Sequence, residues 1–264
     1  METNAQNSNM GVLKIKEATN NYTLTRYPAS EHTSFFVKHY WCVSWDVSEK
    51  EQFLQDVIPN PCVNLVVEHN KTGIFGPTKR KFSYLVKGKG IVFGVKFRPG
   101  GFYPFIKKSV SDLSSLPMNV QDVFGVSTQT LEETILFEQD AQLATKYIEN
   151  IIEESLPKRD EQITFVNQII DLIISEQSIT KVEHLCDHFH IHKRKLQRIF
   201  QQYVGVSPKW VIKLYRLQNA AEIIENNNDH NWIDLSMQLG YYDQSHFIRD
   251  FKTIIGKTPE EYAK

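Results

Sequence analysis

Long apolar runs are missing from this sequence, and so is the pattern of a secretory signal. No stretch of about 18 consecutive apolar residues occurs, which is the length that a membrane-spanning helix needs. The first residues, METNAQNSNM, are polar and lack the basic-then-apolar order of a signal peptide. We therefore expect a soluble, cytoplasmic protein with no membrane partner.

Cysteine is scarce as well. Cys42, Cys62 and Cys186 are too few and too scattered for a disulfide framework or a CxxC zinc motif. The segment HLCDHFHIH places His184 and His188 four residues apart, which is a metal-ligand spacing on a helix. Neutral histidines at a surface turn are the alternative, and we expect no metal.

Catalytic motifs are also missing. The sequence shows no Ser-His-Asp arrangement, phosphate-binding loop or paired-carboxylate motif. We therefore expect a protein that is not an enzyme and that needs no cofactor.

Two kinds of sequence pattern divide the chain. Up to about residue 110, short runs rich in Val, Phe and Tyr, such as CVNLVVEH and GIVFGVKF, predict strands. Beyond it, apolar residues three and four apart predict helices, and a proline with a charge cluster, SLPKRDEQ, separates two helical patterns. The predicted fold class is α+β with two domains: a disordered terminus at 1–11, a β-rich domain with C-terminal helices at 12–157, and an all-α domain at 158–264.

The all-α domain contains an internal repeat. The matched pairs are Leu185 with Leu235, Phe200 with Phe251, and Gly205 with Gly256. Each copy has the pattern of a helix-turn-helix, at about 181–203 and 232–254. Between the copies, apolar residues three and four apart predict one amphipathic helix over 208–226. Such a helix, about 28 Å long, can hold two reading helices about one DNA turn of roughly 34 Å apart.

The turns and helix ends of the repeat carry suitable residues. Asp243 is predicted to cap the second helix of the second copy, and Gly256 to take the left-handed conformation beyond its end. In the first copy the turn carries His190, a residue that tolerates a positive φ better than most.

The net charge of −1 hides a local excess of positive charge. No Asp or Glu occurs between His188 and Ala221, although seven cations do: Lys193, Arg194, Lys195, Arg198, Lys209, Lys213 and Arg216. A solvated helix face is the alternative, but an acid-free stretch inside a repeated helix-turn-helix favours a phosphate-binding surface. We expect these seven charges to be uncompensated.

Polar side chains on the second helix of each copy suit base reading. Arginine pairs bidentately with guanine and glutamine with adenine, each contact discriminating by about 1–3 kcal/mol, whereas lysine mainly holds phosphate. The residues that these helices offer to bases and phosphates are Lys193, Arg194, Gln197 and Arg198 in the first copy and Gln244, Ser245, His246 and Arg249 in the second. Those expected to hold phosphates are Lys193, Lys209, His246 and Lys252.

The repeat resembles the double helix-turn-helix domain of AraC/XylS-type bacterial transcription regulators. The resemblance covers about residues 163–262 and is carried by LQRIFQQYVGVSPKWVIKLYRLQNAAEII and IDLSMQLGYYDQSHFIRDFKTIIGKTPEEY. It implies sequence-specific binding to double-stranded promoter DNA. The residues that the resemblance places at positions that commonly face the groove, and that we expect to read bases, are Arg194, Gln197, Arg198, Gln244, Ser245 and Arg249. Three positions depart from the family pattern: His190 replaces a usual glycine, His192 a frequent capping serine, and Ser236 a usual small apolar residue.

The β-rich domain is similar to a sensor domain of these regulators, through YWCVSW, VIPNPCVNLVVE and GVKFRPGGFYPF. The similarity implies a sensor or dimerisation domain that responds to a small-molecule effector. RNA polymerase and a second copy of the chain are further candidate partners. Within RPGGFYPF, Phe102, Tyr103 and Phe105 are candidates to line a ligand pocket, and a structural corner that ends the β unit is the equal alternative.

Two other functions stay open. One is an interaction or small-molecule-binding protein whose helical domain no longer binds DNA, which the near-neutral net charge and the acidic residues after Ala221 support. The other is an alkyl-transfer regulator that uses Cys62 as a reactive thiol. The alternative for Cys62 is a buried cysteine beside a strand.

Overall fold

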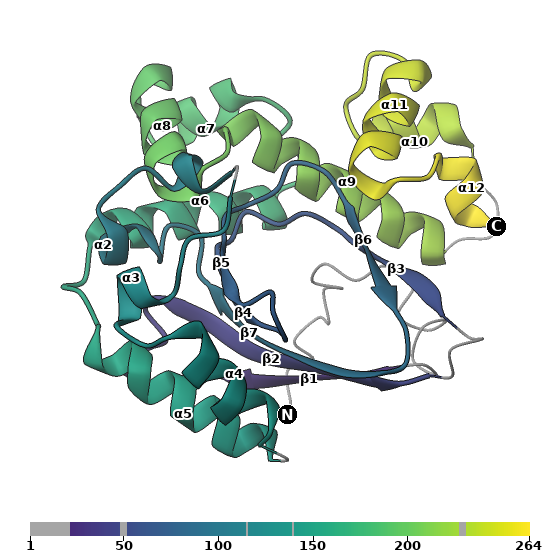
Figure 1. The fold of residues 1–264 in the computed structure, drawn as a ribbon. Coiled ribbons are helices and arrows are strands. Elements are labelled where there is room, and N and C mark those ends of the chain that lie inside the picture. Colours follow the sequence, from purple (N-terminus) through teal and green to yellow (C-terminus); the bar gives the residue numbers. More distant parts are fainter. Residues whose placement is uncertain (1–21, 48–51, 115, 139, 227–230) are drawn as a thin grey trace, which may run out of the picture.

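The computed structural model describes residues 22–47, 52–114, 116–138, 140–226 and 231–264. A β-rich unit with its own helices is followed by a run of helices (Figure 1). The predicted disordered segment 1–11 lies outside the described residues, as do residues 12–21 of the predicted β-rich domain. The predicted boundary after residue 157 falls in the connection between α5 (Ala141–Glu154) and α6 (Glu161–Ser175).

The described residues form two antiparallel sheets. The five-stranded sheet has the order β1-β2-β7-β4-β5, and the two-stranded sheet pairs β3 with β6. The strands are β1 (Thr23–Pro28), β2 (Val37–Asp46), β3 (Phe53–Val57), β4 (Asn64–Val67), β5 (Gly73–Phe75), β6 (Phe82–Val86) and β7 (Lys89–Phe97). The run CVNLVVEH contains β4, and GIVFGVKF makes up all of β7 but its first residue, so these predicted strands are confirmed.

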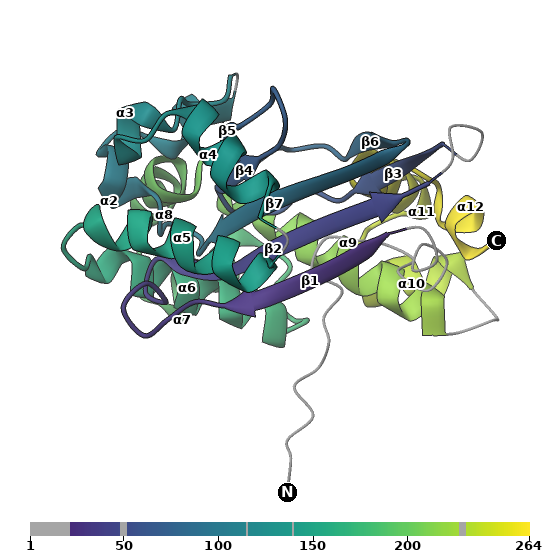
Figure 2. The ribbon, with the colours of Figure 1, turned by 60° about the horizontal axis from the view of Figure 1, so that its bottom comes forward.

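One face of the five-stranded sheet is covered by helices of the same unit. Tyr40 of β2 and Val95 of β7 are directly paired across the two strands, and both are fully buried. They belong to one core with Leu131 of α4 (Thr128–Leu136) and Ile148 of α5. Figure 2 shows α4 and α5 beside the sheet. The β-rich unit and its helical appendage therefore share a core.

A carboxylate fixes α5 against the loop that follows β1. Glu149 accepts hydrogen bonds from the Ser30 backbone N–H (2.9 Å), the Thr33 hydroxyl (2.6 Å) and the Tyr40 hydroxyl (3.0 Å). Burial would raise the pKa of Glu149, but the hydrogen bonds outweigh it and hold the pKa below its ordinary value. The ionised carboxylate therefore stabilises this junction.

The remaining helices include both predicted helix-turn-helix units, which are confirmed as α7–α8 and α10–α11. The helices of the β-rich unit, besides α4 and α5, are α2 (Tyr103–Ile106), the 3₁₀ turn η2 (Val110–Ser114) and α3 (Gln121–Phe124). After α6 come α7 (Val182–His188), α8 (Lys193–Ile199), the π-helical turn η3 (Phe200–Val204), α9 (Pro208–Asn226), α10 (Trp232–Gln238), α11 (Gln244–Ile255) and α12 (Pro259–Ala263).

The predicted turn and cap residues of the repeat are confirmed. The Asp243 carboxylate accepts a hydrogen bond from the His246 backbone N–H (2.7 Å), which satisfies a free donor in the first turn of α11. Gly256 ends α11 with φ +93°, and His190 makes the turn between α7 and α8 with φ +48°. His192 begins α8 without a side-chain cap, so this helix start lacks the bond that a serine could supply.

The helix α9 joins the two units and is the centre of the C-terminal core. It has 19 residues, which corresponds to about 28 Å. Its bounds coincide with the predicted ones. Trp210, Val211 and Ile212 are buried in succession, and Leu214 and Leu217 are fully buried. Burial of consecutive residues means that α9 is covered on more than one face, by both helix-turn-helix units and α6.

The β-rich unit meets the C-terminal domain at η3, directly after α8. The Tyr103 ring lies 4.1 Å from the Tyr203 ring, centroid to centroid, and the Gln202 side-chain amide donates to the Tyr103 hydroxyl at 2.5 Å. The Ser109 hydroxyl donates to the Gln201 carbonyl at 3.0 Å. These contacts attach η3, and with it the end of α8, to the β-rich unit.

The rings proposed for a ligand pocket fill space at this junction. Phe102 is 1% exposed, and its ring lies 4.9 Å from Phe97 in an edge-to-face contact and 5.8 Å from Phe105 in a stacked one. Tyr103 packs on Tyr203. Of the two alternatives for this segment, these contacts match the structural corner that ends the β unit.

One pair of substitutions tests the inward and outward faces of α11. Phe251 is fully buried and contacts Phe247 and Tyr262, whereas Arg249 is exposed. We expect Phe251→Ala to lower the free energy of unfolding by about 3–5 kcal/mol, because it leaves a cavity in the core. Arg249→Ala should leave it nearly unchanged in denaturant titrations. Equal losses would contradict the assigned faces.

Candidate nucleic-acid interface

The helix α8 presents a polar face to solvent. Leu196 is fully buried and Ile199 is 5% exposed, so these two residues fix the helix against the core. Arg194, Gln197 and Arg198 are exposed, at spacings of three and four that place them on one side of the helix. The structure therefore brings together the three predicted base-reading residues of the first unit.

The helix α11 repeats this arrangement. Phe247 and Phe251 are fully buried, and Ser245 and Arg249 are exposed. Gln244, the first residue of the helix, is half-buried. The predicted reading residues of the second unit thus lie in the first two turns of a well-capped helix. The side chain of Gln244 is the least exposed of the three.

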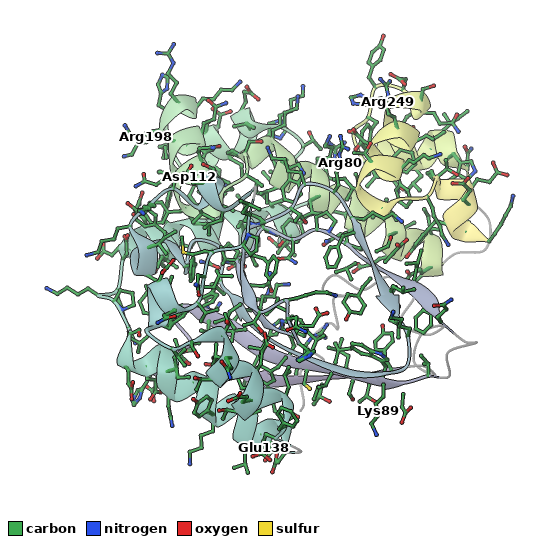
Figure 3. All side chains as sticks on the ribbon, viewed as in Figure 1. Arg80, Lys89, Asp112, Glu138, Arg198 and Arg249 are labelled. Carbon is green, nitrogen blue, oxygen red and sulfur yellow. The ribbon has the colours of Figure 1, made fainter. Side chains whose placement is uncertain are left out.

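The two predicted reading helices, α8 and α11, stand apart on the C-terminal domain, with α9 between them (Figure 1). In Figure 3, Arg198 on α8 and Arg249 on α11 lie along the same side of the molecule, away from the β-rich sheet. The length of α9, about 28 Å, is comparable with the distance of roughly 34 Å between successive major grooves on one face of B-DNA.

Three of the seven cations expected to be uncompensated have partners, so that expectation was wrong. Lys193 Nζ lies 2.6 Å from a Glu183 carboxylate oxygen, and Lys213 Nζ lies 3.0 Å from one of Asp250. Arg216 is turned inward. Its guanidinium lies over the Tyr241 ring, 4.4 Å from the centroid, and donates to the Leu239 carbonyl.

The partners come from helices and a turn outside the acid-free run, which is why the sequence pattern did not reveal them. Arg194, Lys195, Arg198 and Lys209 remain exposed, and none of them forms an ion pair within the described part of the chain. A groove between α7, α8 and α9 is lined by Lys193, Gln197 and Lys209 among others. The net positive surface is therefore smaller than predicted and is centred on α8.

The predicted phosphate-holding residues are dispersed over both units. Lys193 and Lys209 lie beside α8, and Lys252 is exposed in the last turn of α11. His246 is exposed, and its ring nitrogen lies 3.5 Å from an Asp250 carboxylate oxygen.

Asp250 was missed by the sequence reasoning. Besides Lys213 and His246, it receives a hydrogen bond from the Tyr241 hydroxyl at 3.4 Å. Asp250 therefore connects α9, the turn of the second unit and α11. The available signal was its spacing, three residues after the buried Phe247 and four before the buried Ile254, which places Asp250 toward the inward side of α11.

The metal and thiol alternatives have little structural support. Among the residues that the structure describes, no group of three His, Cys, Asp or Glu side chains could hold a metal ion. A His184 ring nitrogen lies 2.9 Å from the Ser178 carbonyl. Cys62 is 4% exposed, and burial raises the pKa of its thiol, which disfavours the reactive thiolate.

No helix in the described ranges is long and apolar enough to cross a membrane.

Two protein families match parts of this chain. A helix-turn-helix domain family matches residues 185–264, and a domain of unknown function (DUF6597) matches residues 25–118. An uncharacterized HTH-type transcriptional regulator of Haemophilus influenzae is 25% identical over 116 residues, 44% of this chain. The transcriptional regulatory protein HptR of Staphylococcus aureus is 25% identical over 101 residues, 38% of this chain. The match spans 39% of the length of each relative.

Among solved structures, ToxT of Vibrio cholerae with a bound unsaturated fatty acid is 12% identical and aligns over 92% of this chain and 95% of its own, with a TM-score of 0.37. That score marks a weak likeness. The repeat and the family matches agree on the C-terminal part. The chain therefore carries an AraC-type helix-turn-helix domain behind an N-terminal domain of the DUF6597 family.

Proposed function

We propose that this chain is a cytoplasmic, sequence-specific DNA-binding transcription regulator that reads two successive major grooves on one face of the duplex. The observation that carries the proposal is the pairing of two exposed polar reading helices, α8 and α11, on one buried linker helix of suitable length. A single chain can then contact two half-sites about one helical turn apart.

The reading residues have distinct roles in this proposal. Arg194, Arg198 and Arg249 pair with guanine through their two-pronged guanidinium groups, and Gln197 and Gln244 pair with adenine. Ser245 donates to or accepts from either kind of base. Lys193, Lys209, His246 and Lys252 neutralise phosphates and fix the register of the protein on the duplex.

The regulatory signal is proposed to reach DNA through the junction at η3. Because η3 continues α8 and contacts α2 and η2 of the β-rich unit, a shift of that unit moves the first reading helix. An effector or partner that binds the β-rich unit more tightly in one arrangement would change promoter occupancy. A small molecule, RNA polymerase and a second copy of the chain are the candidates for that role.

One observation favours a second function, an interaction protein. Ile233 and Met237 of α10 and Tyr242 of the following turn are 51%, 64% and 97% exposed, which is unusual for large apolar side chains. They lie on the second helix-turn-helix unit, where a protein partner could cover them. Salt dependence separates the two functions, since only contacts with phosphates produce a steep loss of affinity as salt rises.

Selection of bound sequences from a random duplex library tests the proposed function. We expect the wild-type chain to enrich a two-part motif with halves about one helical turn apart. The Arg198→Ala, Arg249→Ala variant should lose it, because each reading helix then lacks an exposed arginine that pairs with guanine. The control, Lys87→Ala with Lys89→Ala, removes the same charge from exposed positions of the β-rich unit and should keep the motif. No enrichment by the wild type would contradict the proposal.

Lys209 and Lys213 belong to one helix but should behave differently. Lys209 is exposed, so Lys209→Ala should reduce the slope of log affinity against log salt by about one and spare stability. Lys213→Ala removes the Lys213–Asp250 ion pair, so the free energy of unfolding should fall by about 1 kcal/mol. Affinity titrations at several salt concentrations and denaturant unfolding measure the two effects. The reverse assignment would contradict the inward placement of Lys213.

The junction can be tested at Tyr103. Tyr103→Ala removes the ring contact with Tyr203 and the acceptor for Gln202, so amide hydrogen exchange across η3 should become faster and DNA binding weaker. Phe137→Ala is the control, because Phe137 is an aromatic residue of the same unit with 81% exposure. Unchanged exchange in η3 would show that the β-rich unit does not restrain the first reading helix.

A further inference from the structure

We propose that the β-rich domain supplies a third DNA contact, through Lys79 and Arg80 of the loop between β5 and β6. Residues 77–81 of this loop form the bridging loop. Its two exposed cations are inferred to hold phosphates of the duplex between the two half-sites. The inference rests on the proposed function, since it concerns the same duplex.

The bridging loop touches equivalent positions of the two helix-turn-helix units. At its beginning, Pro77 lies against Gly205, where a Cβ added to the glycine would be only 3.1 Å from the proline ring. At its end, the Lys81 side chain lies so close to Gly256 that a Cβ there would collide with it. Gly205 and Gly256 are the matched glycines of the repeat. Gly205 ends η3, the continuation of α8, with φ +81°, and Gly256 ends α11 with φ +93°.

Both ends of the bridging loop are held in place. Lys81 Nζ lies 2.5 Å from an Asp56 carboxylate oxygen, and the Ser83 hydroxyl donates to the other Asp56 oxygen at 2.6 Å. Asp56 belongs to β3, so the ribbon of β3 and β6 carries the end of the loop to the second unit. Pro77 has no φ freedom at the other end. The loop therefore runs from the end of η3 to the end of α11, and both of its ends are held in place.

The middle of the bridging loop is exposed and positively charged. Thr78, Lys79 and Arg80 are all exposed, whereas Lys81 is half-buried and engaged with Asp56. Within the described ranges, neither Lys79 nor Arg80 forms an ion pair with an acidic side chain. In the view of Figure 3, Arg80 lies between Arg198 and Arg249. The bridging loop thus carries two free cations between its contact with Gly205 and its contact with Gly256.

The linker helix leaves this interval short of positive charge. Lys213 and Arg216, in the middle of α9, are engaged with Asp250 and with Tyr241. When two helices enter successive major grooves on one face, the duplex between them presents its minor groove and the phosphates of both strands. Cations on the bridging loop complement that negative charge where α9 does not. Because phosphates carry no sequence information, the contact adds affinity without changing the motif.

The test measures the affinity of the chain for the selected duplex at several salt concentrations. Lys79→Ala with Arg80→Ala should reduce the slope of log affinity against log salt by about two and weaken binding to every sequence alike. The enriched motif should stay the same. Lys87→Ala with Lys89→Ala is the matched control, because it removes two exposed lysines from the same domain. In Figure 3, Lys89 lies at the opposite edge of the molecule from Arg198 and Arg249. This control should keep the wild-type slope.

A charge-conserving variant tests whether the alanine variant changes the slope through lost charge or through an altered loop structure. Lys79→Arg with Arg80→Lys should restore the wild-type slope, because phosphate contact needs the charge rather than the side-chain type. If the alanine variant had the same slope as the control while the wild type bound its motif, the bridging-loop contact would be overturned and the proposed function would stand. If the wild type bound no duplex with salt-dependent affinity, both would be overturned.

Discussion

Burial of α9 is the constraint on which the rest of the C-terminal domain depends. Nine of its 19 residues are buried, and they contact both helix-turn-helix units and α6. Each fully buried large apolar side chain stabilises the fold by about 1.5–3 kcal/mol. The helix cannot bend or slide without exposing several of them, so it sets a fixed distance between α8 and α11. The reading of two grooves by one chain requires such a distance.

The positive charges of the domain serve two purposes, and the division follows from burial. Lys213 and Arg216 lie on half-buried positions of α9, where a charge without a partner would be costly, and they meet Asp250 and Tyr241. Arg194, Arg198 and Lys209 lie on exposed positions and stay available. Inward cations hold the second unit on α9, and outward cations define the candidate DNA surface. The same residue types therefore contribute to stability in one place and to recognition in another.

The sequence predicted the helical half of the fold more closely than the contacts between its parts. The spacing of apolar residues and the matched glycines determined the two units and the bounds of α9, because these features depend on neighbours a few residues away. The partners of Lys193 and Lys213 escaped prediction, since Glu183 and Asp250 reach them from other helices. The aromatic run at Phe102 was open between a pocket and a corner, because its packing against Phe97 and Tyr203 depends on the tertiary fold. The bridging loop was not anticipated at all, because only the fold brings Pro77 and Lys81 to the two matched glycines.

The central claim is that a helix of fixed length holds two reading helices on one face of the duplex. The most direct test is affinity for the selected duplex after base pairs are inserted between its two halves. About 5 inserted base pairs turn one half to the opposite face, and about 10 restore the face but lengthen the span. Because α9 is buried and cannot extend, both insertions should reduce affinity to that of a duplex with a single half. Affinity that survives either insertion would contradict the account, since it would require reading helices on a flexible connection.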